Sequence, residues 1–68
     1  MKTTKQLLVT LKELNPEAHC TYHHAVWGQE VGWVSHLWGV PISGYHEDKT
    51  IALREAINVL RKEDAHDN

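Results

Sequence analysis

Several features that are common in small proteins are missing from this sequence, and each absence excludes a class of protein to which the chain could belong. The chain has no phenylalanine and only one cysteine, Cys20, so no internal disulfide can reinforce a thin core. No apolar run approaches the roughly 20 residues of a membrane-spanning helix, so we expect no membrane segment. A single free thiol without a signal peptide is typical of the reducing cytoplasm, and a cytoplasmic protein is predicted.

The motifs of common active sites are missing as well. The sequence contains no G-x-S-x-G, P-loop or G-x-G-x-x-G pattern. Nucleophilic catalysis through Cys20 would need a positioned base and oxyanion donors, and a free cysteine is more often buried and inert. Carboxylates are nearly absent from the central segment. We therefore predict that the protein is not an enzyme and uses no cofactor.

Charge is scarce in the middle of the chain. Residues 19–46 contain one charged residue, Glu30, yet they hold all three tryptophans, both tyrosines and five of the six histidines. The other charges lie in the two flanks, and the formal net charge is −2. This balance argues against a chain whose affinity comes from neutralising phosphates. The uncharged, aromatic segment is therefore either the core of the protein or its binding face.

The first flank has the pattern of an amphipathic helix over about residues 4–14. Thr3 and Gln6 have capping-box spacing, in which each side chain satisfies a free backbone N–H of the other residue. Asn15-Pro16 then ends the helix, because proline disfavours helical geometry in the residue before it. One side of the helix carries apolar residues that we expect in the core: Leu7, Leu8, Leu11 and Leu14.

The second flank predicts a helix over residues 51–62. Asp48 is the best N-cap candidate, because its carboxylate suits the positive end of the helix dipole. The apolar stripe of this helix comprises Leu53, Ala56, Ile57 and Leu60. A chain of this length forms one domain, which we place at residues 1–62. Residues 63–68 are polar, and we expect them to be a disordered tail.

The central segment predicts an antiparallel β-hairpin. Cys20 to Trp27 and Val31 to Val40 are rich in β-branched, aromatic and small residues, and Gly28 to Glu30 supply a turn between them. Pro41 should close the second strand, since proline cannot donate to a ladder. Ile42 to Tyr45 are then either a short third strand or an extended connection. The predicted fold class is α+β, in the order α-β-β-(β)-α, with a hairpin or small sheet packed against two amphipathic helices.

The second predicted strand has an unusual distribution of side chains, because alternation places apolar residues on both of its faces. One face would carry Val31, Trp33 and Leu37, and the other Val34, Trp38 and Val40. Antiparallel sheets with a solvated face normally carry polar residues there, so something should cover the second face. The cover could be a helix on each face, a second copy of the chain or a different protein. Because a two- or three-stranded sheet is marginal alone, we favour a homodimer through the sheet.

One part of the chain resembles a known family. The segments Ser43 to Asp48 and Thr50 to Ile57, with Gly32-Trp33-Val34 before them, resemble the second half of the bacteriophage ABA-sandwich domain. That family often shows a W-x-V strand, a serine-glycine-tyrosine connection and a helix that opens with small and apolar residues. A charged stretch, His46 to Lys49, stands here in place of a shorter glycine-containing turn. The resemblance covers about half of the chain and implies a small accessory protein of a phage or prophage, without catalytic residues.

Metal binding is the sharpest chemical alternative. The candidate ligands are His19, Cys20, His23, His24, His36 and His46, whose types suit zinc. Adjacent His23 and His24 point to opposite faces of a strand, so at most one of them joins any given site. His23 and His36 could meet across the hairpin only if the register allows it. There is neither a C-x-x-C knuckle nor a helical H-x-x-x-H, and we predict no metal site.

The composition favours protein binding, because tryptophan and tyrosine are enriched at interaction hot spots and charge is depleted from interface centres. The partner-binding residues that we predict are Trp27, Trp33, His36, Trp38 and Tyr45. The predicted function is a non-enzymatic accessory protein that binds and modulates a host protein, for example as an inhibitor of host defence. The alternative is a nucleic-acid-binding accessory protein. Glu47 and Asp48 before the last helix disfavour it, since double-stranded RNA-binding domains carry lysines there.

Overall fold

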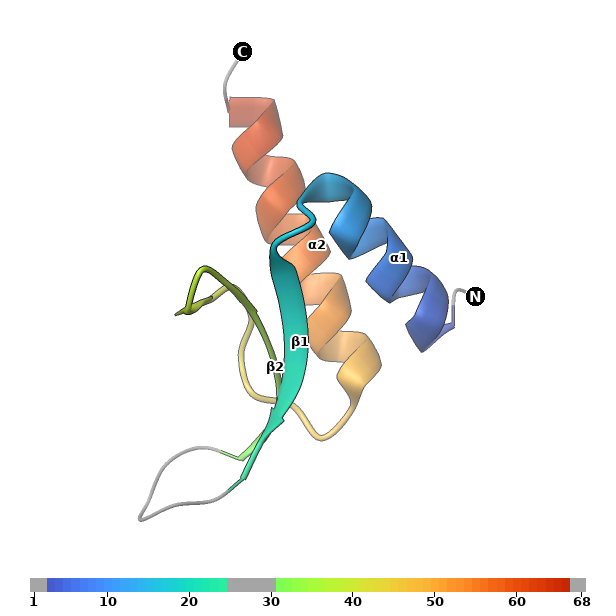
Figure 1. Cartoon of the computed structure of the whole chain (residues 1–68), viewed down its shortest axis with the longest axis vertical. Helices are drawn as coiled ribbons and strands as arrows, with labels where there is room; N and C mark the ends of the chain where they lie inside the picture. Colours follow the sequence, from blue (N-terminus) through green and yellow to red (C-terminus); the bar gives the residue numbers. More distant parts are fainter. Residues whose placement is uncertain (1–2, 25–30, 67–68) are drawn as a thin grey trace.

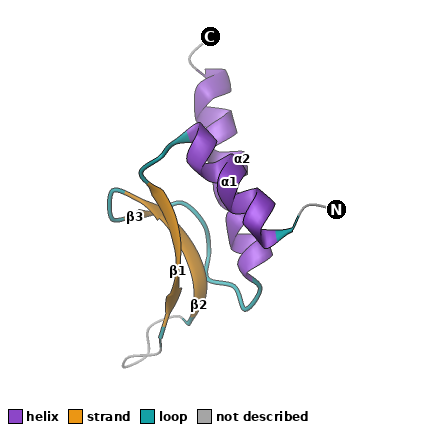
Figure 2. Ribbon diagram, turned by 45° about the vertical axis from the view of Figure 1, so that its right-hand side comes forward, coloured by secondary structure: helices purple, strands orange, loops and turns teal. Residues whose placement is uncertain are grey.

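The computed structural model describes residues 3–24 and 31–66, with side chains described as far as Lys62, and it confirms an α+β fold. Two helices lie on one side of a three-stranded antiparallel sheet (Figures 1 and 2). The elements in chain order are α1 (Thr4–Leu14), β1 (Ala18–His23), β2 (Gly32–Leu37), β3 (Val40–Pro41) and α2 (Lys49–His66). Neither helix is both long and apolar enough, in the part of the chain described, to cross a membrane.

Helix α1 has the bounds and the cap that the sequence predicts. The Gln6 backbone N–H donates to Thr3 Oγ1 at 3.2 Å, and the Thr3 backbone N–H donates to Gln6 Oε1 at 2.8 Å. At the other end, the Asn15 N–H donates to the Leu11 carbonyl oxygen at 3.0 Å, and Asn15 itself is extended. The residues that cap this helix are local in sequence, which is why its ends could be predicted.

Helix α2 begins at Lys49, directly after the predicted N-cap Asp48 and two residues before the predicted start at residue 51, and it is longer than predicted. Asp48 Oδ1 accepts a hydrogen bond from the Thr50 N–H at 2.9 Å, and its carbonyl oxygen accepts from Ile51 at 3.1 Å. The helix continues to His66, four residues beyond the predicted end at Lys62. It therefore includes part of the segment that was expected to be a tail. Nothing local stops it, because residues 61–66 contain neither glycine nor proline.

The sheet has the order β1-β2-β3, and several predicted strand boundaries are wrong. Strand β1 begins at Ala18 instead of Cys20 and ends at His23, and β2 begins at Gly32 instead of Val31. The second strand ends at Leu37 instead of Val40, because Trp38 and Gly39 both have positive φ and turn the chain back. The third strand is Val40–Pro41, so Pro41 lies in β3 and does not close the second strand as predicted. Residues 42–45 form a connection, which is the other alternative that the sequence left open. The predicted strand residues 25–27 and the predicted turn at 28–30 lie outside the described residues.

The core lies between the helices and one face of the sheet. Its buried members are Leu7, Leu11, Ala18, Leu37, Leu53, Ala56, Ile57 and Leu60. Burial of apolar surface on this scale is the main stabilising contribution in a domain of this size. Ser35 is the one buried polar residue in the described part of the chain, and its Oγ donates to the Ala52 carbonyl oxygen at 3.0 Å, so β2 is hydrogen-bonded to α2.

Candidate functional site

The pairing register decides which side chains share each face of the sheet. One face points toward the helices, because Ala18 and Leu37 lie in the core and Ser35 contacts α2. The cross-strand pairs on this helix face are Ala18 with Leu37, Cys20 with Ser35, and Tyr22 with Trp33. The pairs on the opposite face, which we call the outer face, are His19 with His36, Thr21 with Val34, and His23 with Gly32. The sequence left three ways to cover the second face of the sheet: a helix on each face, a second copy of the chain or a different protein. The arrangement with a helix on each face is therefore excluded.

The outer face combines imidazole rings with a hydroxyl and a buried valine. The His19 and His36 rings lie side by side, with centroids 5.8 Å apart, and Thr21 Oγ1 is 3.3 Å from His36 Nε2. Val34 is only 6% exposed, although both described helices lie on the other face of the sheet. Tyr45 lies on this side as well, since its ring packs edge-on against His23 at 5.4 Å between centroids. The described outer-face residues therefore form a mixed surface of aromatic and polar groups without formal charge.

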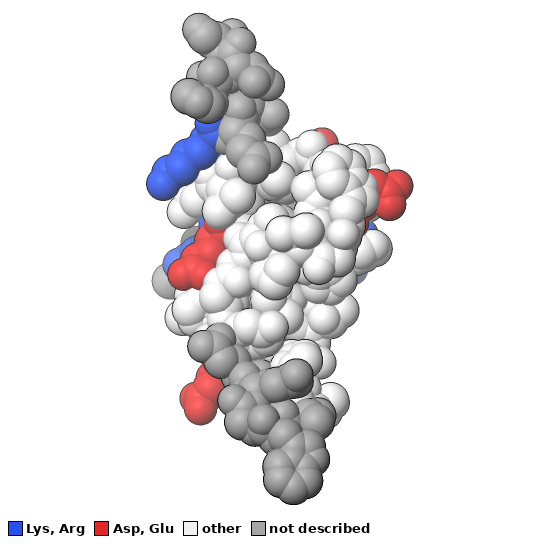
Figure 3. All heavy atoms as spheres, turned by 90° about the vertical axis from the view of Figure 1, so that its left-hand side faces the viewer, with Lys and Arg blue, Asp and Glu red and all other residues white. Residues whose placement is uncertain are grey.

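The surrounding surface has the same character. Figure 3 shows the molecule from the side of the sheet opposite the helices. Lysine, arginine, aspartate and glutamate side chains lie at the margins of this view, and the central surface that is drawn white carries none of them. A broad uncharged centre with a charged rim is the usual composition of a protein–protein interface.

Trp38 projects from the turn at one end of the outer face. It is 74% exposed, and its backbone has φ of 54°. Gly39 follows at φ of 79°, and Leu37 pairs with Val40 across this two-residue loop. Positive φ at both central residues is the geometry of a type I′ turn, which favours asparagine, aspartate or glycine at the position that Trp38 occupies. A bulky residue there is an outlier, and it holds an indole ring in solvent.

Trp33 has a different environment, on the helix face. Its ring packs edge-on against Tyr22 at 5.3 Å between centroids, and the Lys49 ammonium lies 4.7 Å from the ring centroid. The contact with Lys49 is a cation–π interaction between β2 and the start of α2. Trp33 is half-buried by these neighbours. It therefore joins the sheet to the helix layer, on the side of the sheet away from the outer face.

The chain between β3 and α2 is held against β2 by main-chain and side-chain contacts. Trp33 and His46 exchange two backbone hydrogen bonds, at 2.6 and 3.0 Å, which form an isolated bridge. Ser43 Oγ accepts from the Ser35 N–H at 2.8 Å. Gly32, with φ of 135°, allows this close approach, because a Cβ there would lie 2.6 Å from the His46 carbonyl oxygen. These contacts fix the segment that carries Tyr45.

Glu55 on α2 forms hydrogen bonds with the chain between β3 and α2. Its Oε1 accepts from the Gly44 N–H at 2.9 Å and lies 2.8 Å from His46 Nε2. Both hydrogen bonds lower the pKa of the Glu55 carboxyl from its ordinary value of 4.5, and the bond from Gly44 has the larger effect. The sequence pattern did not predict this pair. The only available signal was a histidine in the connection followed nine residues later by a glutamate on a helix.

The register also decides the metal hypothesis. His36 lies opposite His19, and His23 lies opposite Gly32, so the register does not bring His23 and His36 together across the hairpin. Cys20 is on the helix face, half-buried against the core, and is separated by the sheet from the outer-face histidines. Within residues 3–24 and 31–62, no three potential ligands are close enough to hold one ion.

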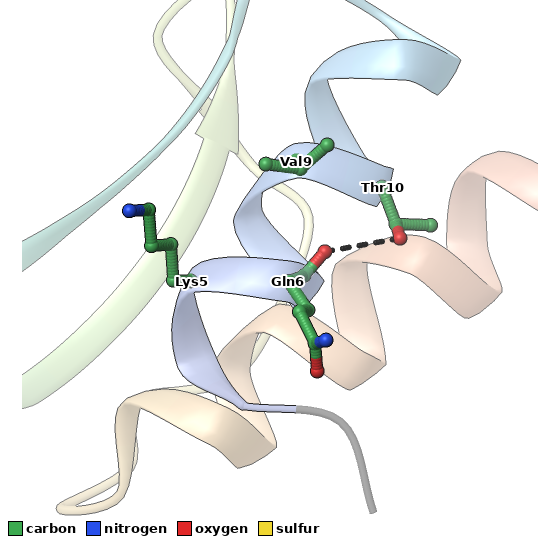
Figure 4. A pocket seen from close by; sticks show the side chains of 4 residues that line it. All are labelled: Lys5, Gln6, Val9 and Thr10. Carbon is green, nitrogen blue, oxygen red and sulfur yellow. Dashed lines mark hydrogen bonds between the residues drawn. The ribbon is translucent and has the colours of Figure 1, made fainter.

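A hollow lies on the outside of α1, away from the sheet (Figure 4). Its described lining comes from successive turns of this helix: Lys5, Gln6, Val9 and Thr10. Thr10 Oγ1 donates to the Gln6 carbonyl oxygen at 3.1 Å, a bond within the helix. Among these side chains only Lys5 is ionisable, so the hollow brings together no acid, base or nucleophile.

The five predicted partner-binding residues fall in different places. His36 and Tyr45 lie on the outer face, and Trp38 is exposed at its end. Trp33 lies on the other face, and Trp27 lies outside the described residues. Val40, which was assigned to the same face as Val34, instead pairs with Leu37 and so lies on the helix side. The structure adds His19, Thr21 and His23 to the candidate surface.

Comparisons of the chain with family models, with curated proteins and with solved structures yield no match.

Proposed function

We propose that this chain is a small non-enzymatic binding protein whose outer face and Trp38 contact another protein. In this proposal it is an accessory protein of a phage or prophage that acts in the host cytoplasm. It binds and modulates a host protein, for example as an inhibitor of a host defence system. The origin and the host target rest on the resemblance to the bacteriophage ABA-sandwich domain, and the binding role rests on the residues of the sheet.

The exposure of Trp38 is the observation that carries the proposal. Tryptophan is the residue type most enriched at binding hot spots, where it fills a pocket of the partner. Here the side chain is 74% exposed, in a turn whose geometry disfavours it. A left-handed backbone costs a non-glycine residue roughly 1–2 kcal/mol. A residue that costs stability and contributes little packing to the fold is best explained by a contact outside the fold.

The outer face supplies the remainder of the proposed surface. Thr21 and His36 can both donate and accept hydrogen bonds, and Tyr45 adds a half-buried ring with a polar tip. Such groups bind a partner through polar contacts around an apolar anchor. In this arrangement Trp38 is the anchor and the outer face is the polar area beside it.

Capture from a bacterial lysate tests the proposal with two matched variants. The immobilised chain is compared with Trp38→Asn, and with Val9→Asn as the control. Val9 is also an exposed apolar residue, 53% exposed, but it lies on α1, in the layer away from the outer face. A partner that is retained by the wild type and by Val9→Asn, and lost by Trp38→Asn, supports the proposal.

The same experiment has an outcome that refutes the binding surface. If Trp38→Asn and a second variant, Tyr45→Ala, retain every protein that the wild type retains, the partner does not use this face. Circular dichroism of each variant shows whether it remains folded. Retention of DNA or RNA that weakens steeply with salt would instead support the nucleic-acid alternative.

A further inference from the structure

Strand β1 forms one edge of the sheet. Among the described strands, the order β1-β2-β3 gives it a single neighbour, and in Figure 1 it stands in front of β2 with no other described strand in front of it. A strand in this position presents backbone N–H and C=O groups along its free edge, where another strand can pair with them. Only the residues of β1 whose N–H and C=O groups point away from β2 are available for such pairing.

The hydrogen bonds of β2 determine which residues of β1 point to the free edge. Trp33 exchanges both of its backbone hydrogen bonds with His46, on the side of β2 away from β1. The pair of Tyr22 with Trp33 is therefore a non-hydrogen-bonded pair of the β1–β2 ladder. Such pairs alternate with hydrogen-bonded pairs along antiparallel strands. Consequently Thr21 bonds to β2, whereas Ala18, Cys20 and Tyr22 direct their N–H and C=O groups to the free edge.

Ala18 already uses its outward groups. Its N–H donates to the Asn15 carbonyl oxygen at 3.0 Å, and its own carbonyl oxygen accepts from Lys12 Nζ at 3.1 Å. The edge that is open to another strand is therefore defined by the N–H and C=O groups of Cys20 and Tyr22. These two residues are symmetrically placed about Thr21.

We propose that β1 pairs antiparallel with β1 of a second copy of this chain, with Thr21 facing Thr21 across a two-fold axis. In this register Cys20 of each copy lies opposite Tyr22 of the other, and the two pairs exchange four backbone hydrogen bonds. The result is a continuous six-stranded sheet. A register centred on Cys20 would instead require the outward groups of Ala18, which Asn15 and Lys12 occupy.

The composition of β1 favours its own copy as the occupant. Natural edge strands usually avoid pairing by carrying lysine, proline or a bulge. The sequence of β1, AHCTYH, contains no proline and no lysine, arginine, aspartate or glutamate, so antiparallel pairing with itself opposes no formal charges. Its free groups also match those of its copy, which is the self-complementarity that a two-fold interface needs.

Edge pairing leaves the outer face free and places two such faces side by side. The dimer therefore does not rest on the proposed function and does not compete with it. It does predict that His19 of one copy lies opposite His23 of the other, on the outer side of the sheet. The candidate surface for a partner would then extend across both copies.

Sedimentation of the wild type, Cys20→Pro and Cys20→Ala tests the proposal. Proline at position 20 removes an N–H that points outward, so the ladder with β2 is kept while pairing with a second copy is blocked. We expect the wild type and Cys20→Ala to sediment as dimers, and Cys20→Pro as a monomer with an unchanged circular dichroism spectrum. A wild type that remains monomeric up to about 1 mM, or a folded Cys20→Pro that remains dimeric, overturns the proposal.

A cross-linking variant tests the register and does not depend on Cys20→Pro folding. In the double variant Cys20→Ala/Thr21→Cys, the two new thiols face each other in a non-hydrogen-bonded pair, where Cα atoms lie about 4.5 Å apart and a disulfide can form. Oxidised glutathione should link this variant into a covalent dimer faster than it links the wild type, whose Cys20 faces Tyr22. Equal or faster linkage of the wild type overturns the Thr21-centred register.

Discussion

Trp38 and Gly32 both have positive φ, for opposite reasons. Gly32 has φ of 135° and lies within reach of the His46 backbone, so no side chain fits there. Trp38 has φ of 54° with its side chain in solvent, in a position where a smaller residue would fit better. The positive φ of Gly32 is required by the packing of the fold, whereas Trp38 is better explained by contact with a binding partner.

Trp38→Asn should stabilise the protein. The change creates an Asn-Gly pair, the preferred sequence of a type I′ turn, and removes a side chain that is 74% exposed. We expect a gain of about 1 kcal/mol in the free energy of unfolding, from relief of left-handed strain. For a domain of this size that gain raises the Tm by roughly 4–8 °C. Thermal denaturation followed by circular dichroism checks this, and a lower Tm would show that the indole packs on the fold.

Gly32→Ala should destabilise the protein. The added Cβ would lie 2.6 Å from the His46 carbonyl oxygen, and a φ of 135° is strained for any residue with a side chain. We expect a loss on the order of 2 kcal/mol or more in the free energy of unfolding. Urea denaturation measures the loss, with Gly39→Ala as the comparison. Gly39 also has positive φ, but a Cβ added there would meet no atom within 4 Å, so its loss should be smaller.

At the scale of elements, the helices and the sheet differ in how much of them could be predicted. The start and end of α1 follow from Thr3, Gln6 and Asn15, which lie within or beside the helix. The end of β2 does not follow from alternation, because Leu37, Trp38 and Val40 continue an apolar run without a break. The turn at Trp38 appears only when Leu37 pairs with Val40.

The connection between β3 and α2 should respond to pH through Glu55. Because its folded-state pKa is lowered, the carboxylate stabilises the fold above its ordinary pKa of 4.5, and this contribution is lost as the pH falls through the lowered value. Glu55→Gln keeps an acceptor for Gly44 and removes the charge. We expect wild type to be more stable than the variant at pH 5 and 7, with a smaller difference at pH 3, below the ordinary pKa of the carboxyl.

The size of this pH effect should be modest. The Glu55 side chain is 45% exposed, so water screens its interaction with His46. Pairs of this kind contribute about 0.2–1 kcal/mol. Urea denaturation of both proteins at the three pH values measures the difference. A difference that stays constant down to pH 3 would show that the charge of Glu55 has no part in holding the connection.

At the scale of the whole molecule, two helices cover one face of a three-stranded sheet, and this arrangement decides how each face of the sheet is used (Figure 2). One face is thereby used for the core, and the other carries the candidate binding surface. The free edge of β1 adds a third surface, which we propose joins two copies. These three surfaces belong to one small sheet, so a change in strand register would alter all of them.

The dimer predicts a Tm that depends on concentration. Association stabilises the folded state by mass action, so the Tm of the wild type should rise with protein concentration. Cys20→Pro should have a Tm that does not change over the same range, because its monomers cannot pair through β1. Calorimetry at several concentrations checks this. A concentration-independent Tm in the wild type, together with a monomeric sedimentation coefficient, would contradict edge pairing.

The sequence by itself determined the order of elements, the capped helix starts and the alternation of side chains along β1 and most of β2. These features depend on residues a few positions apart, and local physical chemistry decides them. Only the tertiary structure decided that His36 faces His19 instead of His23, that Val40 lies on the helix side and that Glu55 holds Gly44. Each of these depends on strand register or on the packing of distant segments, which a local pattern does not specify.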